Sequence, residues 1–223
     1  MKGTMRKIAL YAAGMSALAL ILLAQSAMAN EDWQYSSSWS ASHALSEKAG
    51  ISFLAEMYAR DDMSDDYVYD EYVGYSYVLC HGLSALAQGY FESVEGAAGI
   101  WDGTRALVIA PVYKTAIPRL GTVQAQARFF WKATDGGEWD YCRPRVDMTR
   151  SAGSWSLYLL DEMRVDLSGR RAEDFYRNRV FAMVSRQLAK SFSLGVGYVR
   201  QSDRGQGDWE SFNVLQTLVH WKF

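Results

Sequence analysis

Side chains in this chain alternate between apolar and polar with a repeat of two residues, through segment after segment from residue 51 onward. In the stretch 122–133 every odd-numbered residue is apolar, whereas the even-numbered ones are Thr, Gln, Arg, Lys and a single Phe. Residues on one side of a helix recur every 3.6 positions, so a repeat of two indicates a strand with one apolar face. The sequence therefore predicts an all-β protein.

The predicted strands are long. Strands of soluble proteins average about five or six residues, whereas a tilted strand that crosses a membrane needs about 9–11. Segments of this greater length are predicted at 51–60, 67–79, 83–91, 104–115, 122–133, 141–149, 155–165, 175–186, 192–202 and 211–223. Their length favours a closed, antiparallel transmembrane β-barrel over a soluble sheet.

Short and long connections alternate between these segments, as in outer-membrane barrels with short periplasmic turns and longer outer loops. The short connections are 80–82, 116–121, 150–154 and 187–191. The longer, polar ones are 61–66, 93–103, 134–140, 166–174 and 203–209. This order places the end of the last strand, Phe223, on the periplasmic side.

The strand number depends on a weaker alternating segment at 33–41, which raises the total to eleven. Bacterial single-chain barrels normally have an even number of strands. We therefore expect about ten strands, with 33–41 as a non-spanning N-terminal piece and twelve strands as the alternative. Pro111 and Pro144 fall inside predicted strands, and bulges are expected there because proline lacks the backbone donor.

The first 29 residues have the features of a cleaved signal peptide. Lys2, Arg6 and Lys7 precede an apolar run at 8–23, and a small-x-small pattern ends at Ala29. Cleavage there leaves 30–223 as one barrel domain. The chain has 23 Lys+Arg and 25 Asp+Glu; without the three basic residues of the leader, 20 face 25, a balance of −5. This charge argues against a nucleic acid as partner.

Alternation alone does not decide which face points outward. A soluble, lipocalin-like ligand-binding barrel in the periplasm turns its apolar face inward, and a membrane barrel turns it toward lipid. Aromatic residues gather near the strand ends, among them Tyr67, Trp139, Trp155 and Trp209, as interfacial girdles do. The polar face carries large charged residues of both signs. We expect the membrane arrangement, in the outer membrane of a bacterium.

In that arrangement the charged face lines the lumen. The predicted lumen residues are Glu56, Arg60, Arg128, Lys132, Arg143, Arg145, Glu162, Arg164 and Arg179. One interpretation is a salt-bridged plug that stiffens the barrel. The other is a narrow channel whose arginines attract small anionic solutes. A barrel of about ten strands is near the size that side chains fill, which argues against a wide channel.

Two resemblances point the same way. Phe223, preceded on one face by Trp221, Val219 and Leu215, looks like the signal that the barrel-assembly machinery reads in outer-membrane proteins. The chain also resembles an uncharacterised family of outer-membrane barrels, catalogued as domain of unknown function 2490. The matching motifs are Leu54-x-Glu56-x-x-x-Arg60, Arg143-Pro144-Arg145, Asp161-Glu162, Asn178-Arg179 and Gly197-Tyr198. This resemblance implies a barrel in the outer membrane and no activity.

Enzymatic chemistry has little support. An outer-membrane lipid hydrolase, the second alternative, requires a Ser–His pair with an orienting group or an Asp–His arrangement at the outer rim. The three histidines are His43, His81 and His220, and the last two are predicted at the periplasmic end. The sequence has no phosphate loop, CxxC motif or metal-spaced cluster. We expect a monomer without cofactor or metal, whose partners are outer-membrane lipid, lipopolysaccharide and the assembly machinery.

Overall fold

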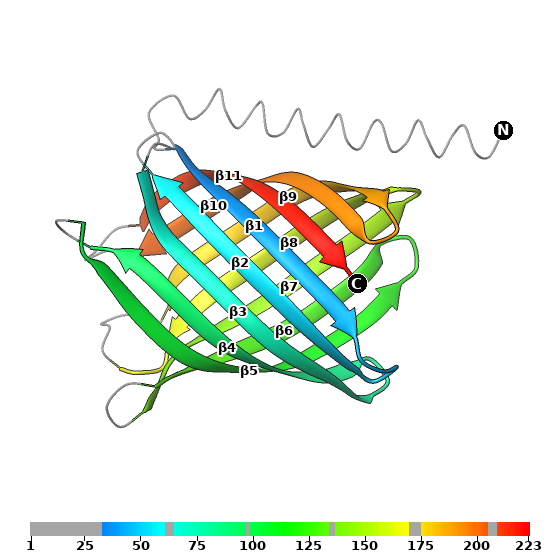
Figure 1. The fold of residues 1–223 in the computed structure, drawn as a ribbon, viewed down its shortest axis with the longest axis horizontal. Helices are drawn as coiled ribbons and strands as arrows, with labels where there is room; N and C mark the ends of the chain where they lie inside the picture. Colours follow the sequence, from blue (N-terminus) through cyan, green and yellow to red (C-terminus); the bar gives the residue numbers. More distant parts are fainter. Residues whose placement is uncertain (1–32, 61–64, 97–98, 134–136, 170–174, 205–208) are drawn as a thin grey trace.

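The computed structural model describes residues 33–60, 65–96, 99–133, 137–169, 175–204 and 209–223. The predicted signal peptide lies outside these residues. The described chain forms eleven strands: β1 (Trp33–Ala44), β2 (Ala49–Arg60), β3 (Asp65–Cys80), β4 (Leu83–Glu95), β5 (Trp101–Ile117), β6 (Gly121–Lys132), β7 (Glu138–Ala152), β8 (Trp155–Asp166), β9 (Phe175–Ala189), β10 (Phe192–Arg204) and β11 (Trp209–Lys222). They close into one barrel, in which each strand pairs with its sequence neighbours (Figure 1).

The barrel closes between β1 and β11, and this pairing corrects the predicted strand number. The two strands run parallel, from Trp33 opposite Asn213 to Ser42 opposite Lys222, whereas all other neighbours are antiparallel. Figure 1 shows both arrows pointing to the same end. An odd number of up-and-down strands necessarily leaves the first and last pointing the same way. A parallel ladder satisfies their backbone groups, so 33–41 belongs to a full strand of the barrel, and the described residues form eleven strands instead of the expected ten or twelve.

The sequence of β1 follows the same inside–outside rule as the other strands. Ser36 and Ser38 are buried on the inner face, and Trp39 is exposed on the outer face. Ser38 donates a hydrogen bond to Glu56 Oε1 of β2 at 2.9 Å, and Gln216 of β11 donates to Ser38 Oγ at 2.9 Å. β1 is therefore bonded to both neighbours through side chains as well as through the backbone.

The bulges expected at the two strand prolines are absent from the described ladders. In the β5–β6 ladder, Ile109 and Val112 are paired and the two residues between them, which include Pro111, are not. In the β7–β8 ladder the same holds for Cys142 and Arg145, on either side of Pro144. The register is the same before and after each gap. The ladder tolerates the missing donor by skipping two pairs. Bulges occur elsewhere, between Tyr58/Ala59, Val78/Cys80, Phe130/Trp131, Arg164/Val165 and Phe192/Ser193.

The two ends of the barrel differ, as the alternation of connections predicts. The end that holds the turns 81–82, 153–154 and 190–191 is called the turn end, and the opposite end the loop end. Gly82, with φ of +74°, has the backbone conformation that a tight turn between β3 and β4 requires. β1 starts at the loop end, and β11 finishes at the turn end. No helix among the described residues is long and apolar enough to span a membrane.

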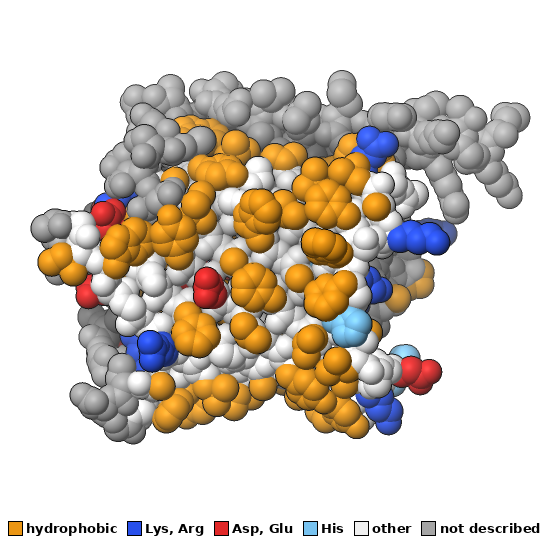
Figure 2. All heavy atoms as spheres, in the orientation of Figure 1, with side chains coloured by type: hydrophobic (Ala, Val, Ile, Leu, Met, Phe, Trp, Pro, Cys, Tyr) orange, Lys and Arg blue, Asp and Glu red, His pale blue; other side chains and the backbone are white. Residues whose placement is uncertain are grey.

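The outer face of the barrel is apolar at mid-strand, and charged residues are buried inside it. Apolar side chains in the middle of the strands are exposed on the outer face, for example Val73 (57 %), Val146 (54 %) and Val196 (54 %). Figure 2 shows hydrophobic side chains spread over the visible outer face. The buried residues include charged ones such as Asp70 and Arg143. The core of this molecule is its lumen, which holds aromatic and charged side chains together.

Candidate functional site

The lumen is filled near its middle by four aromatic rings from four strands. These rings belong to Tyr72, Tyr90, Phe130 and Tyr141, all buried. Their successive ring centroids are 4.7, 5.3 and 4.3 Å apart. Arg143 lies over the Phe130 ring at 4.7 Å and donates to the hydroxyl oxygens of Tyr72 and Tyr141, both at 3.2 Å. These five residues are called the plug.

A second set of buried polar residues lies beside the plug and is held by charge. Arg145 donates to the Tyr158 hydroxyl at 2.8 Å and forms ion pairs with Asp147 at 3.3 Å and Glu162 at 3.9 Å. Arg179 donates from Nε to Gln201 Oε1 at 2.7 Å. Each of these arginines has several partners, which is the condition for burying a charge without a large penalty.

Eight of the nine predicted lumen residues have contacts with inward-facing groups or line a cavity near the loop end, whereas Arg60, the last residue of β2, has a side chain that is 40 % exposed. Arg128, Arg143, Arg145, Glu162 and Arg179 lie together, and Glu162 interacts electrostatically with the four arginines. The other four are spread out: Glu56 accepts from Ser38, Arg60 pairs with Glu95 at 3.5 Å, Lys132 pairs with Asp140 at 3.0 Å, and Arg164 lies near the loop end. Their role in selectivity or stability stays a prediction.

Sequence reasoning missed the tyrosines of the plug and two residues that bulges turn inward. Tyr72 and Tyr90 occupy inner positions that the two-residue repeat identifies, yet tyrosine is equally common in interfacial girdles. Asp140 is the unpaired extra residue where Phe130 and Trp131 face Tyr141 and Trp139. In the same way, Arg164 and Val165 of β8 pair with residues 177 and 175 of β9, so that Tyr176 is the extra residue between them. Such insertions re-aim side chains and break the repeat.

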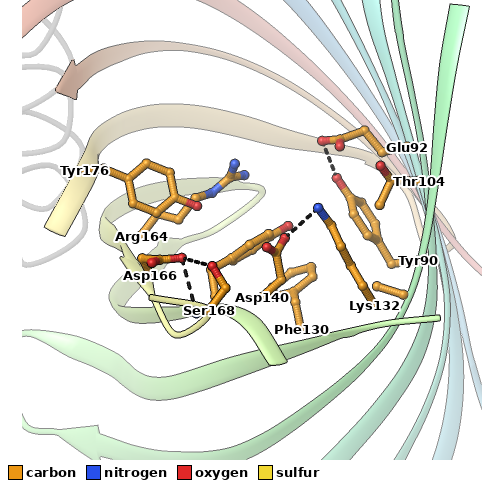
Figure 3. Close-up of a pocket in the computed structure, with 12 residues that line it drawn as sticks. Tyr90, Glu92, Thr104, Phe130, Lys132, Asp140, Arg164, Asp166, Ser168 and Tyr176 are labelled. Carbon is orange, nitrogen blue, oxygen red and sulfur yellow. Dashed lines mark hydrogen bonds and ion pairs between the residues drawn. The ribbon is translucent and has the colours of Figure 1, made fainter. Parts of the chain in front are cut away.

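A cavity of about 390 Å³ lies between the plug and the loop end (Figure 3). The plug residues Tyr90, Phe130 and Tyr141 form one side of it. Charged residues from four strands line the remainder, together with Thr104, Ala106, Ser168 and the bulged Tyr176; they are Glu92, Lys132, Asp140, Arg164 and Asp166. This volume is within the range of about 300–1,000 Å³ usual for small-molecule sites.

One serine–histidine contact exists at the turn end. Ser40 Oγ lies 2.9 Å from His220 Nδ1 and 3.3 Å from the carbonyl oxygen of Val219, which competes for the hydroxyl proton. Within the described part of the chain, no carboxylate is bonded to His220, and His43 contacts the Phe223 carbonyl instead. No group of three or more described His, Cys, Asp or Glu residues could hold a metal ion. A hydrolytic triad is therefore not assembled among these residues.

The residues of the predicted assembly signal lie along the outer face of β11 and just beyond it. Trp221 is exposed, and Leu215 and Val219 share its face. Phe223 stacks on the His43 ring at 5.0 Å between centroids, and its backbone N–H donates to the Ser42 carbonyl. That an assembly machinery recognises these residues stays a prediction.

Comparison of the chain with family models, with curated proteins and with solved structures gave no match. The resemblance to the family of unknown function 2490 accordingly stays a prediction.

Proposed function

We propose that this protein is a structural barrel of the bacterial outer membrane, whose lumen is closed by the plug. The observation that supports this proposal is the placement of apolar and charged residues. Apolar residues such as Val73 and Val146 are exposed at mid-strand, and Asp70, Arg143 and Arg179 are buried. In water, the exposed face would be an apolar surface far larger than the few hundred Å² usual on soluble monomers. In lipid, it is the favourable surface, and closure leaves no unpaired strand edge.

The plug favours a structural barrel over the narrow channel. Its rings are in contact with one another, and Arg143 is bonded to two of the four strands that supply them. An ion that passed through this level would have to displace buried, hydrogen-bonded groups. A soluble ligand-binding barrel would need a mainly apolar interior, and the inner faces here bury arginines and carboxylates beside the aromatic rings.

Substitution at the centre of the outer face tests the membrane location. In Val73→Lys, the charge would face lipid at mid-strand, where it costs about 2–4 kcal/mol in a membrane barrel. Denaturant titration of the folded protein in lipid vesicles would measure this loss. On a soluble barrel the same exposed substitution stays within about 0.5 kcal/mol. Wild-type stability of Val73→Lys, together with recovery of the parent in the soluble periplasmic fraction, would contradict the proposal.

Planar-bilayer recording tests the closed lumen separately. The parent is expected to show no stepwise conductance, and Arg143→Ala, which removes the link between two plug tyrosines, is expected to introduce it. Arg128→Ala and Arg145→Ala would alter ion selectivity only in a conducting lumen. Conductance by the parent with selectivity changed in these two variants would instead support the narrow anionic channel.

A further inference from the structure

Arg164 is a charged group in the cavity whose hydrogen-bonding capacity is unused. Its guanidinium carbon lies 4.5 Å from the centroid of the Tyr141 ring and 5.9 Å from that of Tyr176. The Nε atom is buried and has no hydrogen-bond partner. Among the described residues, no carboxylate forms an ion pair with Arg164, whereas the buried Arg145 has two such partners. An inward arginine held by two rings and open to a cavity is a ready receptor for an anion.

The other cation of the cavity is already neutralised. Lys132 Nζ lies 3.0 Å from Asp140 Oδ2, and the bulge in β7 turns Asp140 inward to make this pair. Lys132 and Asp140 therefore form a neutral unit on the cavity wall. Arg164 is left as the cation available to a solute.

A carboxylate is available on the opposite wall. Glu92 Oε2 of β4 lies 2.7 Å from the Tyr90 hydroxyl, whose single proton is shared with Asp70 Oδ1 at 2.9 Å, and the second oxygen of Glu92 has capacity for a further donor. Figure 3 shows the Arg164 guanidinium and the Glu92 carboxylate on either side of the same space. The rings of Tyr90, Phe130 and Tyr141 line the same cavity and offer an apolar surface to the body of a ligand.

The balance of charge in the cavity defines the class of solute. Beside the Lys132–Asp140 pair, Arg164 and Glu92 face the cavity with opposite charges, so a simple anion on Arg164 would lie in the field of the Glu92 carboxylate. A solute that also carries an ammonium group avoids this repulsion by placing that group near Glu92. We propose that the cavity binds a small zwitterion of the amino-acid class, with its carboxylate on Arg164, its ammonium toward Glu92 and its carbon chain on the plug rings. This site goes beyond the structural role and is independent of where the barrel resides.

Three probes of equal chain length separate the charges: 6-aminohexanoate, hexanoate and hexylamine. Isothermal titration of the purified full chain in detergent is expected to show the tightest binding for 6-aminohexanoate. Hexanoate is expected to bind about tenfold more weakly or worse, because one charged hydrogen bond is lost, and hexylamine more weakly still. Equal binding of hexanoate and 6-aminohexanoate, or binding of none of the three, would overturn the proposal.

Variants at the two walls assign the contacts. Arg164→Met should weaken 6-aminohexanoate by about tenfold or more, and Arg164→Lys should restore part of the loss. Glu92→Gln should weaken 6-aminohexanoate and leave hexanoate unchanged or tighter. Arg186 is the matched control, because it lies over the Trp155 ring at 5.3 Å near the turn end, outside the cavity. If Arg164→Met fails to fold, Glu92→Gln still decides, and unchanged 6-aminohexanoate affinity in that variant contradicts the proposal.

Discussion

Close approach of backbone and side chain explains why β10 has glycine at residue 197. A Cβ atom at this position would lie 2.7 Å from the Ala182 carbonyl oxygen and 3.0 Å from Met183 Cα. Both atoms are backbone and cannot rotate away. Gly197→Ala is expected to lower the free energy of unfolding by about 1–3 kcal/mol, the usual cost of overpacking, as measured by urea titration in detergent.

Gly89→Ala in β4 is the control for this prediction. An added Cβ at Gly89 meets only the end of the Phe91 ring, at 3.7 Å, which is ordinary van der Waals contact. Its stability is expected to stay within about 0.5 kcal/mol of the parent. Equal loss in both variants would show that glycine is needed for a reason other than space at residue 197.

Loss of the arginine in the plug should cost stability as well as closure. Arg143→Met leaves the Tyr72 and Tyr141 hydroxyl oxygens without the donor that joins them. The expected loss is about 1–3 kcal/mol in the free energy of unfolding, from the same urea titration. Arg150 is exposed near the turn end, and Arg150→Met should remain within about 0.5 kcal/mol. A similar loss in both would argue against a special role of the plug.

The two-residue repeat predicts individual inner residues well and fails where a bulge interrupts it. All nine lumen residues follow from the repeat, because each lies on the charged face of its own strand. Asp140 and Tyr176 could not be predicted, since one inserted residue moves a side chain to the other face. The cavity depends on these two residues, and therefore lay beyond sequence reasoning. A bulge is set by the partner strand, which the repeat within one strand does not reveal.

At the scale of the element, the sequence of β1 has the alternation of a barrel strand, but the rule that strand numbers are even excludes it. Its alternation is present, with Trp39 outward and Ser36 and Ser38 inward. Serine makes the contrast weak, and an even strand number is normal for bacterial barrels. The even number is a regularity of known barrels, whereas closure requires only that the first and last strands can pair. The other ten strands were each predicted to within a few residues.

Paired cysteines test the parallel β1–β11 contact. Ser37 lies opposite Thr217, and Ala41 opposite Trp221, so partner numbers rise together, as parallel strands require. Ser37→Cys with Thr217→Cys, and Ala41→Cys with Trp221→Cys, are both expected to form a disulfide on oxidation, because neighbouring strands are about 4.8 Å apart. Non-reducing gel electrophoresis of the folded protein, in a background lacking Cys80 and Cys142, would detect the bridge.

Ala41→Cys with Thr217→Cys is the mismatched control. These positions are four residues out of register, a displacement of about 13 Å along the strands, too far for a disulfide. Bridging in this pair, or in neither matched pair, would mean that β1 does not occupy the seam between β2 and β11.

At the scale of the whole molecule, the alternation predicted a barrel but did not decide whether the apolar face of the strands points outward. In the structure, Val73 is exposed on the outer face and Arg143 is buried inside, so the apolar face points outward. The charged lumen residues could be predicted because the expected membrane arrangement turns charged side chains away from lipid. The filled middle could not, since it depends on which rings from separate strands meet at one height. The proposed closure of the lumen thus depends on the assembled barrel and not on any single strand.

The proposed orientation of the barrel in the outer membrane rests on its unequal ends, and labelling of cysteines in intact cells tests it. Leu167 is exposed at the loop end and Ser154 at the turn end. With longer connections outside and short turns in the periplasm, Leu167→Cys should react with a membrane-impermeant maleimide in intact cells. Ser154→Cys should react only after the outer membrane is permeabilised. Replacing Cys80 and Cys142 by serine removes the background, because Cys80 is exposed.

The parallel pairing of β1 with β11 gives a second expectation for the same labelling. Because β1 begins at the loop end, Trp33→Cys should react in intact cells, as Leu167→Cys does, and not only after permeabilisation, as Ser154→Cys does. The reverse pattern would invert the orientation, and equal labelling of both ends in intact cells would contradict a membrane-spanning barrel.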